Sequence, residues 1–134
     1  MMEYLLDTNI CIYIIKKRPT IVFEKFQSLS IGSVGISSIT LAELQYGIMK
    51  SSDPIKNQEA LNKFLTPIEI LDFDFFASTD YGKVRANLEQ KGTPIGPLDT
   101  LIAAHAKSLD LILVTNNERE FERIIGLKIE NWTK

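Results

Sequence analysis

The sequence predicts an α/β domain in which a central, mostly parallel sheet of about five strands is covered by helices on both faces. Short apolar runs, clearest at residues 4–6 and 111–114, end abruptly in polar residues, as buried parallel strands do. Longer segments with a helical spacing of apolar residues separate these runs. Strands that alternate with helices are typical of a three-layer α/β/α arrangement around a parallel sheet.

Each element is predicted from a local pattern of apolar and turn-forming residues. The predicted strands are 4–6, 34–37, 68–71, 111–114 and 128–130, with the last at an edge of the sheet. The predicted helices are 10–15, 21–29, one opening at residue 40, 55–65, 75–91, 97–106 and a last one ending near residue 126. Prolines punctuate this order, because Pro19 stops the first helix and Pro97 suits the first position of another.

Length and composition indicate one globular domain covering residues 1–134. The chain is 45% hydrophobic and 24% charged, which is ordinary for a globular protein with a real core. A net charge of -2 argues against binding nucleic acid through a strongly basic surface. It does not exclude a nuclease, since clustered acidic metal ligands lower the net charge and a bound cation inverts the local field.

The cysteine content and the hydropathy of the sequence indicate the cellular compartment in which the protein is expected. Cys11 is the only cysteine, so no internal disulfide is possible and a reducing compartment fits. No apolar run approaches the roughly 20 residues that a membrane span needs, and the first residues lack the basic region of a signal peptide. We therefore expect a cytoplasmic protein without membrane contact.

Three acidic residues stand at the starts of predicted helices: Asp7, Glu43 and Asp99. Asp7 and Glu43 also come shortly after predicted strands, and the carboxyl ends of parallel strands share one edge of a sheet. Carboxylates gathered there would repel one another unless a positive charge lay among them. Oxygen ligands without histidine or cysteine suit Mg²⁺ or Mn²⁺, ions that activate water and neutralise charge on a phosphodiester.

Each acid also has a purely structural interpretation. Thr40-x-x-Glu43 matches a capping box, in which the glutamate bonds back to the start of its own helix. Asp99 in a first helical turn would interact favourably with the helix dipole. Asp7, followed by Thr-Asn, could form a turn or a cap. The shared placement of the three acids, more than any one of them, favours a common site.

Four segments together resemble PIN-domain ribonucleases, and specifically the VapC toxins of bacterial toxin–antitoxin pairs. They are residues 6–9 (Leu-Asp-Thr-Asn), 37–44, 94–106 and 114–121, and they span essentially the whole chain. Any one segment is a weak signal, whereas their order and spacing are specific. The resemblance implies the three-layer PIN fold and a Mg²⁺-dependent endoribonuclease, with Mn²⁺ as a substitute.

The resemblance also assigns residues to the site. It implies that Asp7, Glu43 and Asp99 bind the divalent ion. A fourth acid often follows the last long strand in this family, but Asn117 occupies that position here, which weakens a second metal position. Glu120 is then a candidate to supply the missing charge.

Two further residues are expected to orient these acids. Thr115 resembles the hydroxyl that hydrogen-bonds the first aspartate in this family, and we expect Asn9 to help order the same site. The implied substrate is cellular RNA, often tRNA, whose cleavage inhibits translation. The implied partner is a VapB-type antitoxin, whose tail covers the acids and whose other end binds promoter DNA. A homodimer is also expected, because one domain is not expected to bury the whole apolar stretch 10–15.

Other residues invite functional assignments that the pattern does not favour. His105 lies six residues beyond Asp99 and about 120° away from it around the helix, so a core or interface position is expected. Gly47, inside a predicted helix, suggests close approach of another backbone or of substrate. Tyr46 could stack on a base, but packing is the expected role.

Two other functions remain open at this stage. A phosphatase would use Asp7 as a covalent nucleophile, but such enzymes usually carry a second acid two residues later, where this chain has Asn9. A regulatory binding module without turnover would not need three acids in this arrangement. The metal-dependent endoribonuclease is the hypothesis that uses all three.

Overall fold

A sheet of five parallel strands forms the centre of the computed structural model, which describes all residues 1–134. The strands follow the order β3-β2-β1-β4-β5, so the last strand lies at an edge, as predicted. The elements along the chain are β1 Tyr4–Leu6, α1 Thr8–Lys16, α2 Thr20–Gln27, β2 Val34–Ser37, α3 Ser38–Met49, α4 Pro54–Leu65, β3 Glu69–Leu71, α5 Phe75–Gln90, α6 Pro97–Ser108, β4 Ile112–Val114, α7 Glu118–Phe121 and β5 Lys128–Glu130.

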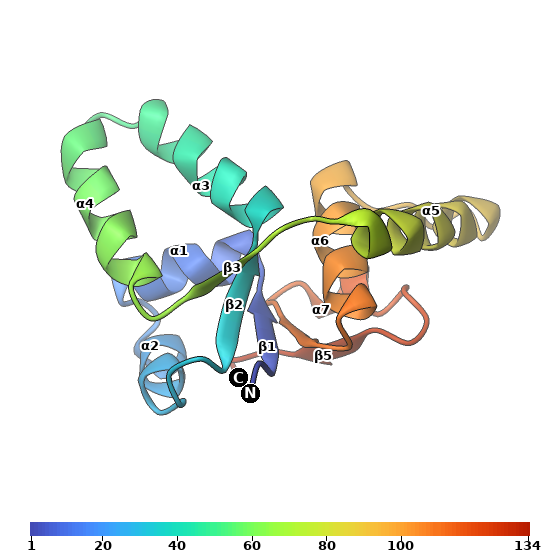
Figure 1. Cartoon of the computed structure of the whole chain (residues 1–134), viewed down its shortest axis with the longest axis horizontal. Helices are drawn as coiled ribbons and strands as arrows, with labels where there is room; N and C mark the ends of the chain where they lie inside the picture. The colour runs from blue at the N-terminus through green and yellow to red at the C-terminus, as the bar shows by residue number, and fades with distance from the viewer.

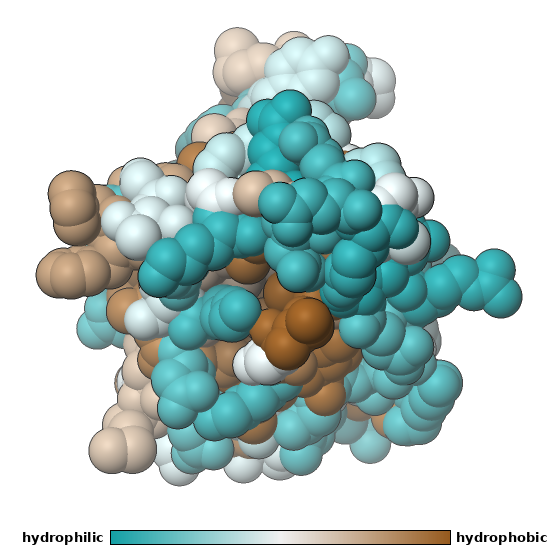
Figure 2. Space-filling view, turned by 90° about the vertical axis from the view of Figure 1, so that its right-hand side faces the viewer, coloured by the Kyte–Doolittle hydropathy of each residue, from teal (hydrophilic) through white to brown (hydrophobic).

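Helices cover both faces of the sheet, and β1 shows why. Tyr4 and Leu6 belong to a buried cluster with residues of α1 to α4, whereas Leu5 between them belongs to a second cluster with residues of α5 and α6. Successive side chains of a strand point to opposite faces, so one fully buried strand serves two cores. Figure 1 shows α1 to α4 on one side of the sheet and α5 to α7 on the other. Figure 2 shows the molecule from the side of α5 to α7, where apolar atoms are visible among mainly hydrophilic ones. The predicted three-layer α/β/α fold is confirmed.

The helix starts are defined by short polar side chains. Asp7, Asp53 and Asp74 each accept a hydrogen bond from a backbone N–H of the helix that follows, which satisfies donors that a helix leaves unpaired. Helix α6 starts with Pro97 at its first position, as predicted. Helix α1 starts two residues earlier than predicted, because Asp7 caps it.

The capping box considered as an alternative role for Glu43 is absent. Ser37 is the N-cap residue and accepts a hydrogen bond from the Ile39 N–H at 3.1 Å. Thr40 therefore lies inside the helix, fully buried, with no hydrogen-bond partner for its hydroxyl. The carboxylate of Glu43 is thereby free of its own helix start.

The last predicted helix is shorter than the pattern suggests. Helix α7 ends at Phe121, and residues 122–127 form turns before β5 instead of continuing to Gly126. The short helix and the turns after it bring Phe121 and Ile124 to the same face of the sheet, where both are buried in the second core. The remaining boundaries lie within about two residues of those predicted.

Three expectations about apolar and small residues need correction. Half of the stretch 10–15 is buried and the rest packs partly against the first core, so the domain itself accounts for this segment. Large exposed apolar side chains lie elsewhere, on α3 (Tyr46, Met49) and at the start of α5 (Phe75, Phe76). Tyr46 is thus 66% exposed instead of packed, and a Cβ placed on Gly47 would meet nothing within 4 Å.

None of the helices combines the length and the hydropathy that crossing a membrane requires.

Candidate functional site

The candidate site lies at the carboxyl ends of three adjacent strands. Asp7 directly follows β1, Glu43 lies in the helix that follows β2, and Thr115 directly follows β4. Because β2, β1 and β4 are neighbours and run in parallel, their carboxyl ends meet at one edge of the sheet. Asp99 in the first turn of α6 reaches the same place, since the charges of Asp7 and Glu43 both act on it.

Asp7 is the buried member of this group, with 5% of its surface exposed. Its Oδ1 accepts a hydrogen bond from the Ile10 N–H at 2.9 Å, so the residue is both helix cap and site carboxylate. Burial raises the pKa of Asp7, and the charge of Glu43 raises it further. Hydrogen bonds from the Thr115 side chain and the Ile10 backbone oppose that rise in pKa. The predicted contact of Thr115 with the first aspartate is therefore present.

Glu43 is held by a residue that the sequence did not single out. The hydroxyl of Thr8 donates to Glu43 Oε1 at 2.6 Å, across 35 positions of the chain. Thr8 is the first residue of α1 and immediately follows Asp7, so one short segment supplies a carboxylate and orients another. Asn9, which was expected to order the site, is exposed and has no side-chain hydrogen bond. In the sequence, only the position of its hydroxyl directly after Asp7 could have indicated that Thr8 belongs to the site.

Asp99 and Glu120 form a pair of acids that share a hydrogen bond. The pKa of Asp99 is raised to about 7, first by burial, then by the hydrogen bond and the charge of Glu120, and finally by Asp7 and Glu43. A hydrogen bond between two carboxyl groups needs a proton on one of them. Glu120 therefore lies beside Asp99, and its part in the site remains a prediction.

Asn117 also contributes, as a donor. Its Nδ2 donates to Glu120 Oε2 at 2.5 Å, and the Gly96 N–H donates to Glu120 Oε1 at 3.3 Å. The Asn117 N–H in turn donates to the Thr115 hydroxyl at 3.0 Å, which ties the turn after β4 to the strand end. Asn117 therefore positions Glu120, at the place where the family resemblance suggests an acid.

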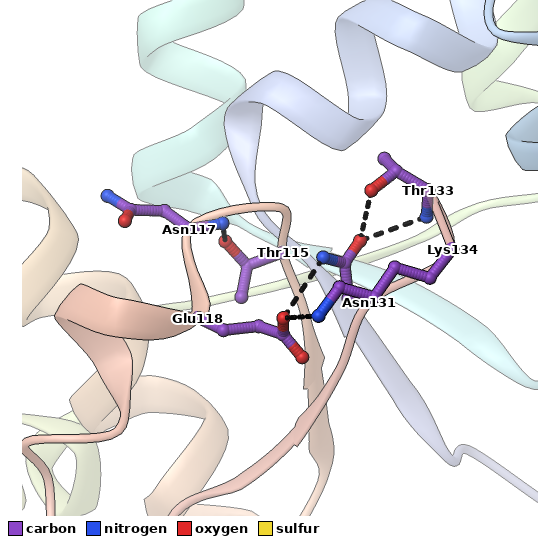
Figure 3. A network of polar contacts seen from close by, with 6 residues as sticks. All are labelled: Thr115, Asn117, Glu118, Asn131, Thr133 and Lys134. Atoms are coloured by element: carbon purple, nitrogen blue, oxygen red, sulfur yellow. Dashed lines mark hydrogen bonds and ion pairs between the residues drawn. The ribbon is translucent and has the colours of Figure 1, made fainter.

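Glu118, between these residues, belongs to a different network. Figure 3 shows its side chain directed toward the C-terminal tail, whereas the Asn117 side chain points away from it. Its carboxylate accepts from Lys134 Nζ at 2.6 Å and from Asn131 Nδ2 at 3.3 Å, and these bonds lower the pKa of Glu118. Glu118 is thus a charge-compensated acid outside the site.

The acidic cluster, defined as Asp7, Glu43, Asp99 and Glu120, has no cation of the protein to balance it. The three ion pairs of the structure involve other residues. No three of its side chains converge as ready ligands of one ion. Asp7, Glu43 and Glu120 each accept a hydrogen bond within the protein, and Asp99 shares a hydrogen bond with Glu120. The predicted trio is therefore gathered within electrostatic range without coordination geometry. Its hard oxygen donors and uncompensated charge fit Mg²⁺ or Mn²⁺.

A groove begins beside the cluster, between α1, α3 and α4. It has a volume of about 310 Å³ and includes Glu43, Lys16 and Gly47. Its remaining lining is largely apolar, from Ile12, Ile15, Leu44, Ile48, Ala60 and Leu61. The groove therefore joins an apolar floor to one carboxylate of the cluster.

His105 is not part of the cluster. Its ring is 1% exposed, Nδ1 lies 2.8 Å from Ser37 Oγ, and Phe73 packs edge-on against it at 5.4 Å between ring centroids. Burial lowers the pKa of His105. The expectation of a core histidine is confirmed.

Comparisons with known proteins agree over the whole chain. The PIN domain family matches residues 4–127. The chain is 49% identical over 133 residues to the tRNA(fMet)-specific endonuclease VapC of Shigella flexneri, covering 99% of this chain and 100% of that protein. Among solved structures, DNA-bound VapBC from Salmonella typhimurium is similar with a TM-score of 0.93 and 48% identity. VapBC2 from Rickettsia felis, bound to a promoter DNA fragment, is similar with a TM-score of 0.92 and 47% identity. Both comparisons cover 98% of this chain and 99% of the other.

Proposed function

The chain belongs to the PIN domain family and is a nuclease, and from this premise we propose that it is the toxin of a toxin–antitoxin pair that cleaves tRNA with Mg²⁺. The observation that carries this proposal is the acidic cluster, in which Asp7, Glu43 and Glu120 all lie within electrostatic range of Asp99 without a balancing cation of the protein. A relative that is 49% identical along its entire length is a tRNA(fMet)-specific endonuclease. Cleavage of cytoplasmic tRNA would inhibit translation.

The residues of the cluster divide the work between them. Asp7, Glu43 and Asp99 are proposed to hold the ion, with Glu120 adding charge and Asn117 positioning Glu120. The ion supplies an activated water and neutralises charge that develops on the phosphodiester. Thr8 and Thr115 keep Glu43 and Asp7 oriented through their hydroxyls, which limits reorganisation when the ion arrives.

The proton on the Asp99–Glu120 pair must leave before both carboxylates face a cation. With the pKa of Asp99 at about 7, this proton is lost near neutral pH, and a cation would lower that pKa further. No side chain of the cluster needs to act as a covalent nucleophile. Asp7 in particular is buried and already caps α1, which does not favour the phosphatase hypothesis.

A VapB-type antitoxin is the proposed partner, since the Salmonella typhimurium and Rickettsia felis relatives were solved as VapBC complexes with DNA. The groove beside Glu43 suits a partner segment that carries apolar side chains and ends in a basic one. Such a segment would cover part of the acidic cluster and inhibit cleavage, while promoter DNA would be bound through the antitoxin. The proposed toxin homodimer remains a prediction, for which the exposed apolar residues of α3 and α5 are the candidates.

The test is cleavage of total tRNA by the purified chain in Mg²⁺, followed by mapping of the new 5′ ends. The D7N/D99N double variant should lose cleavage, because it removes two of the three carboxylates proposed to hold the ion. D110N is the matched control: it makes the same chemical change at an exposed acid that pairs with Lys128 and does not belong to the cluster. Asn also tolerates the left-handed backbone of Asp110 (φ 56°).

Three results would contradict the proposal. These are cleavage by the double variant at the wild-type rate, equal loss in D110N, and wild-type activity that persists in excess chelator. Release of phosphate from simple monoesters, with tRNA left intact, would point to the phosphatase instead.

A further inference from the structure

The buried pair of His105 and Ser37 is not used by the proposed chemistry. It is a side-chain hydrogen bond between residues 68 positions apart, both essentially inaccessible to solvent. His105 is on α6, the helix that carries Asp99, and Ser37 is the N-cap of α3, the helix that carries Glu43. The pair therefore joins the two helices that present acids of the cluster from opposite sides of the site.

The hydrogen bonds around the pair define its protonation state. The backbone of Asp72 accepts a hydrogen bond from the imidazole, which places a proton on the ring nitrogen other than Nδ1. With the ring neutral, Nδ1 is an acceptor, and the Ser37 hydroxyl donates to it. Ser37 Oγ simultaneously accepts from the Ile39 N–H at 3.1 Å. We call these hydrogen bonds, from Asp72 through His105 and Ser37 to Ile39, the relay. One arrangement of its protons gives every polar side-chain atom in it a hydrogen-bond partner.

The segment between β3 and α5 is held by the same relay. The Phe73 N–H donates to Ser38 Oγ at 3.1 Å, and the Phe73 ring packs edge-on against His105. Asp72 supplies the backbone acceptor for the imidazole. Three parts of the chain, namely the start of α3, the last turn of α6 and residues 72–73, therefore converge on one buried ring.

We propose that His105 and Ser37 are positioning residues, which set the distance and orientation of α3 relative to α6 and thereby preassemble Glu43 and Asp99 for the cation. Glu43 lies six residues after Ser37 on α3, and Asp99 lies six residues before His105 on α6. Because helices are stiff over such lengths, a fixed contact at 37 and 105 constrains both carboxylates. A site whose oxygens do not yet form coordination geometry depends on such constraints to close around an ion.

Binding of Mn²⁺, measured by calorimetry without RNA, tests this inference separately from activity. Asn and Leu are similar in shape, but only Asn offers an acceptor near Nδ1, so H105N and H105L form a matched pair. We expect H105L to weaken Mn²⁺ binding about tenfold, and H105N by about threefold or less. The concentration of Mg²⁺ for half-maximal tRNA cleavage should rise in parallel, with the KM for tRNA unchanged.

A second variant removes the other end of the relay. S37A should weaken Mn²⁺ binding about as much as H105L, and adding S37A to H105L should cause no further loss. S108A is the control, because it deletes a hydroxyl that donates only to the His105 backbone carbonyl, at 2.8 Å. If H105L does not fold, the comparison of S37A, H105N and S108A still decides the question.

The inference rests on the proposed function, and the outcomes separate the two. Wild-type protein that neither binds Mn²⁺ nor cleaves tRNA would contradict the proposed function. Wild-type protein that does both, with unchanged Mn²⁺ affinity in H105L and S37A, would overturn the positioning role alone. Equal weakening in H105N and H105L would also overturn it, because the hydrogen bond would then not matter.

Discussion

The two sides of the acidic cluster are held in different ways. Asp7 and Glu43 come from the half of the molecule built on α1 and α3, and each accepts a hydrogen bond from a neutral N–H or hydroxyl. Asp99 and Glu120 come from α6 and α7, and they hydrogen-bond each other. The first pair is therefore oriented without any proton or ion. The second pair is stable only while a proton, or in our proposal a cation, lies between the carboxylates.

This difference separates orientation from charge. Neutral donors fix the direction of a carboxylate and leave its charge available to a ligand. A shared proton fixes two carboxylates together but removes one of the charges that a divalent cation would need. We therefore expect substitutions around Asp7 and Glu43 to change how the cation is bound. Substitutions at Asp99 and Glu120 should change how stability depends on pH.

The largest effect is expected from D7N. Loss of one ligand carboxylate should reduce tRNA cleavage about a thousandfold, or ~4 kcal/mol in transition-state stabilisation. Folding should be hardly affected, because Asn caps helices about as well as Asp and the buried charge is removed. Cleavage assays and urea unfolding check both parts. An unfolded D7N protein would show that Asp7 is mainly structural.

The pH dependence of stability should come from Asp99 and Glu120. The pKa of Asp99 is about 7 in the folded protein, above the usual value for aspartate, so the folded state binds this proton more tightly than the unfolded state. Its contribution to stability is fully present below about pH 4 and is lost as the pH rises through about 7. Thermal melts in chelator should therefore show a falling melting temperature over this range.

Two comparisons sharpen that prediction. D99N should flatten the decline, because Asn has no proton to lose. Mg²⁺ should stabilise the wild-type protein more at pH 8 than at pH 5.5, since protonation competes with the cation. A decline of the same size in D99N would assign it to other groups, of which Asp7 is the first candidate because its pKa is also raised.

An intermediate effect is expected from T8V, which replaces a hydroxyl by a methyl group of similar size. Glu43 loses its donor at 2.6 Å and becomes free to adopt other rotamers. We expect about tenfold weaker Mn²⁺ binding and a similar loss of cleavage at limiting Mg²⁺. T133V is a suitable control, because that hydroxyl bonds only Asn131 in the C-terminal tail. Rescue of T8V by high Mg²⁺ would support an orienting role, whereas loss at saturating Mg²⁺ would contradict it.

The sequence was sufficient for the architecture, and it singled out the acids of the cluster, but it did not show which residues orient them. The strand ends at Asp7 and Thr115 are local features, since apolar runs stop there, and the alternation of elements predicts parallel strands. The bond from Thr8 to Glu43 spans 35 positions and depends on how α1 and α3 pack, which no local pattern encodes.

The errors have the same origin. Thr40 and Glu43 carry the spacing of a capping box, yet Ser37 provides the cap because the strand ends there and the helix starts at once. The end of α7 was misplaced because residues 122–126 keep helical composition while turns bring Ile124 into the core. In both places, tertiary packing decided between two locally acceptable structures.

The smallest effect is expected from N117D, which restores an acid at the position where the family often has one. The change replaces the Nδ2 donor to Glu120 by a carboxylate, so a hydrogen bond becomes a repulsion beside an already protonated pair. Without cation, the melting temperature should fall by a few degrees, which corresponds to roughly 1 kcal/mol. With cation, the added charge should strengthen Mn²⁺ binding by about threefold. E120Q tests the other end of the same hydrogen bond in the opposite direction, because it removes a charge and the shared proton together. If N117D weakens Mn²⁺ binding instead, Asn117 serves the cluster as a donor, and orientation matters more than charge on this side as well.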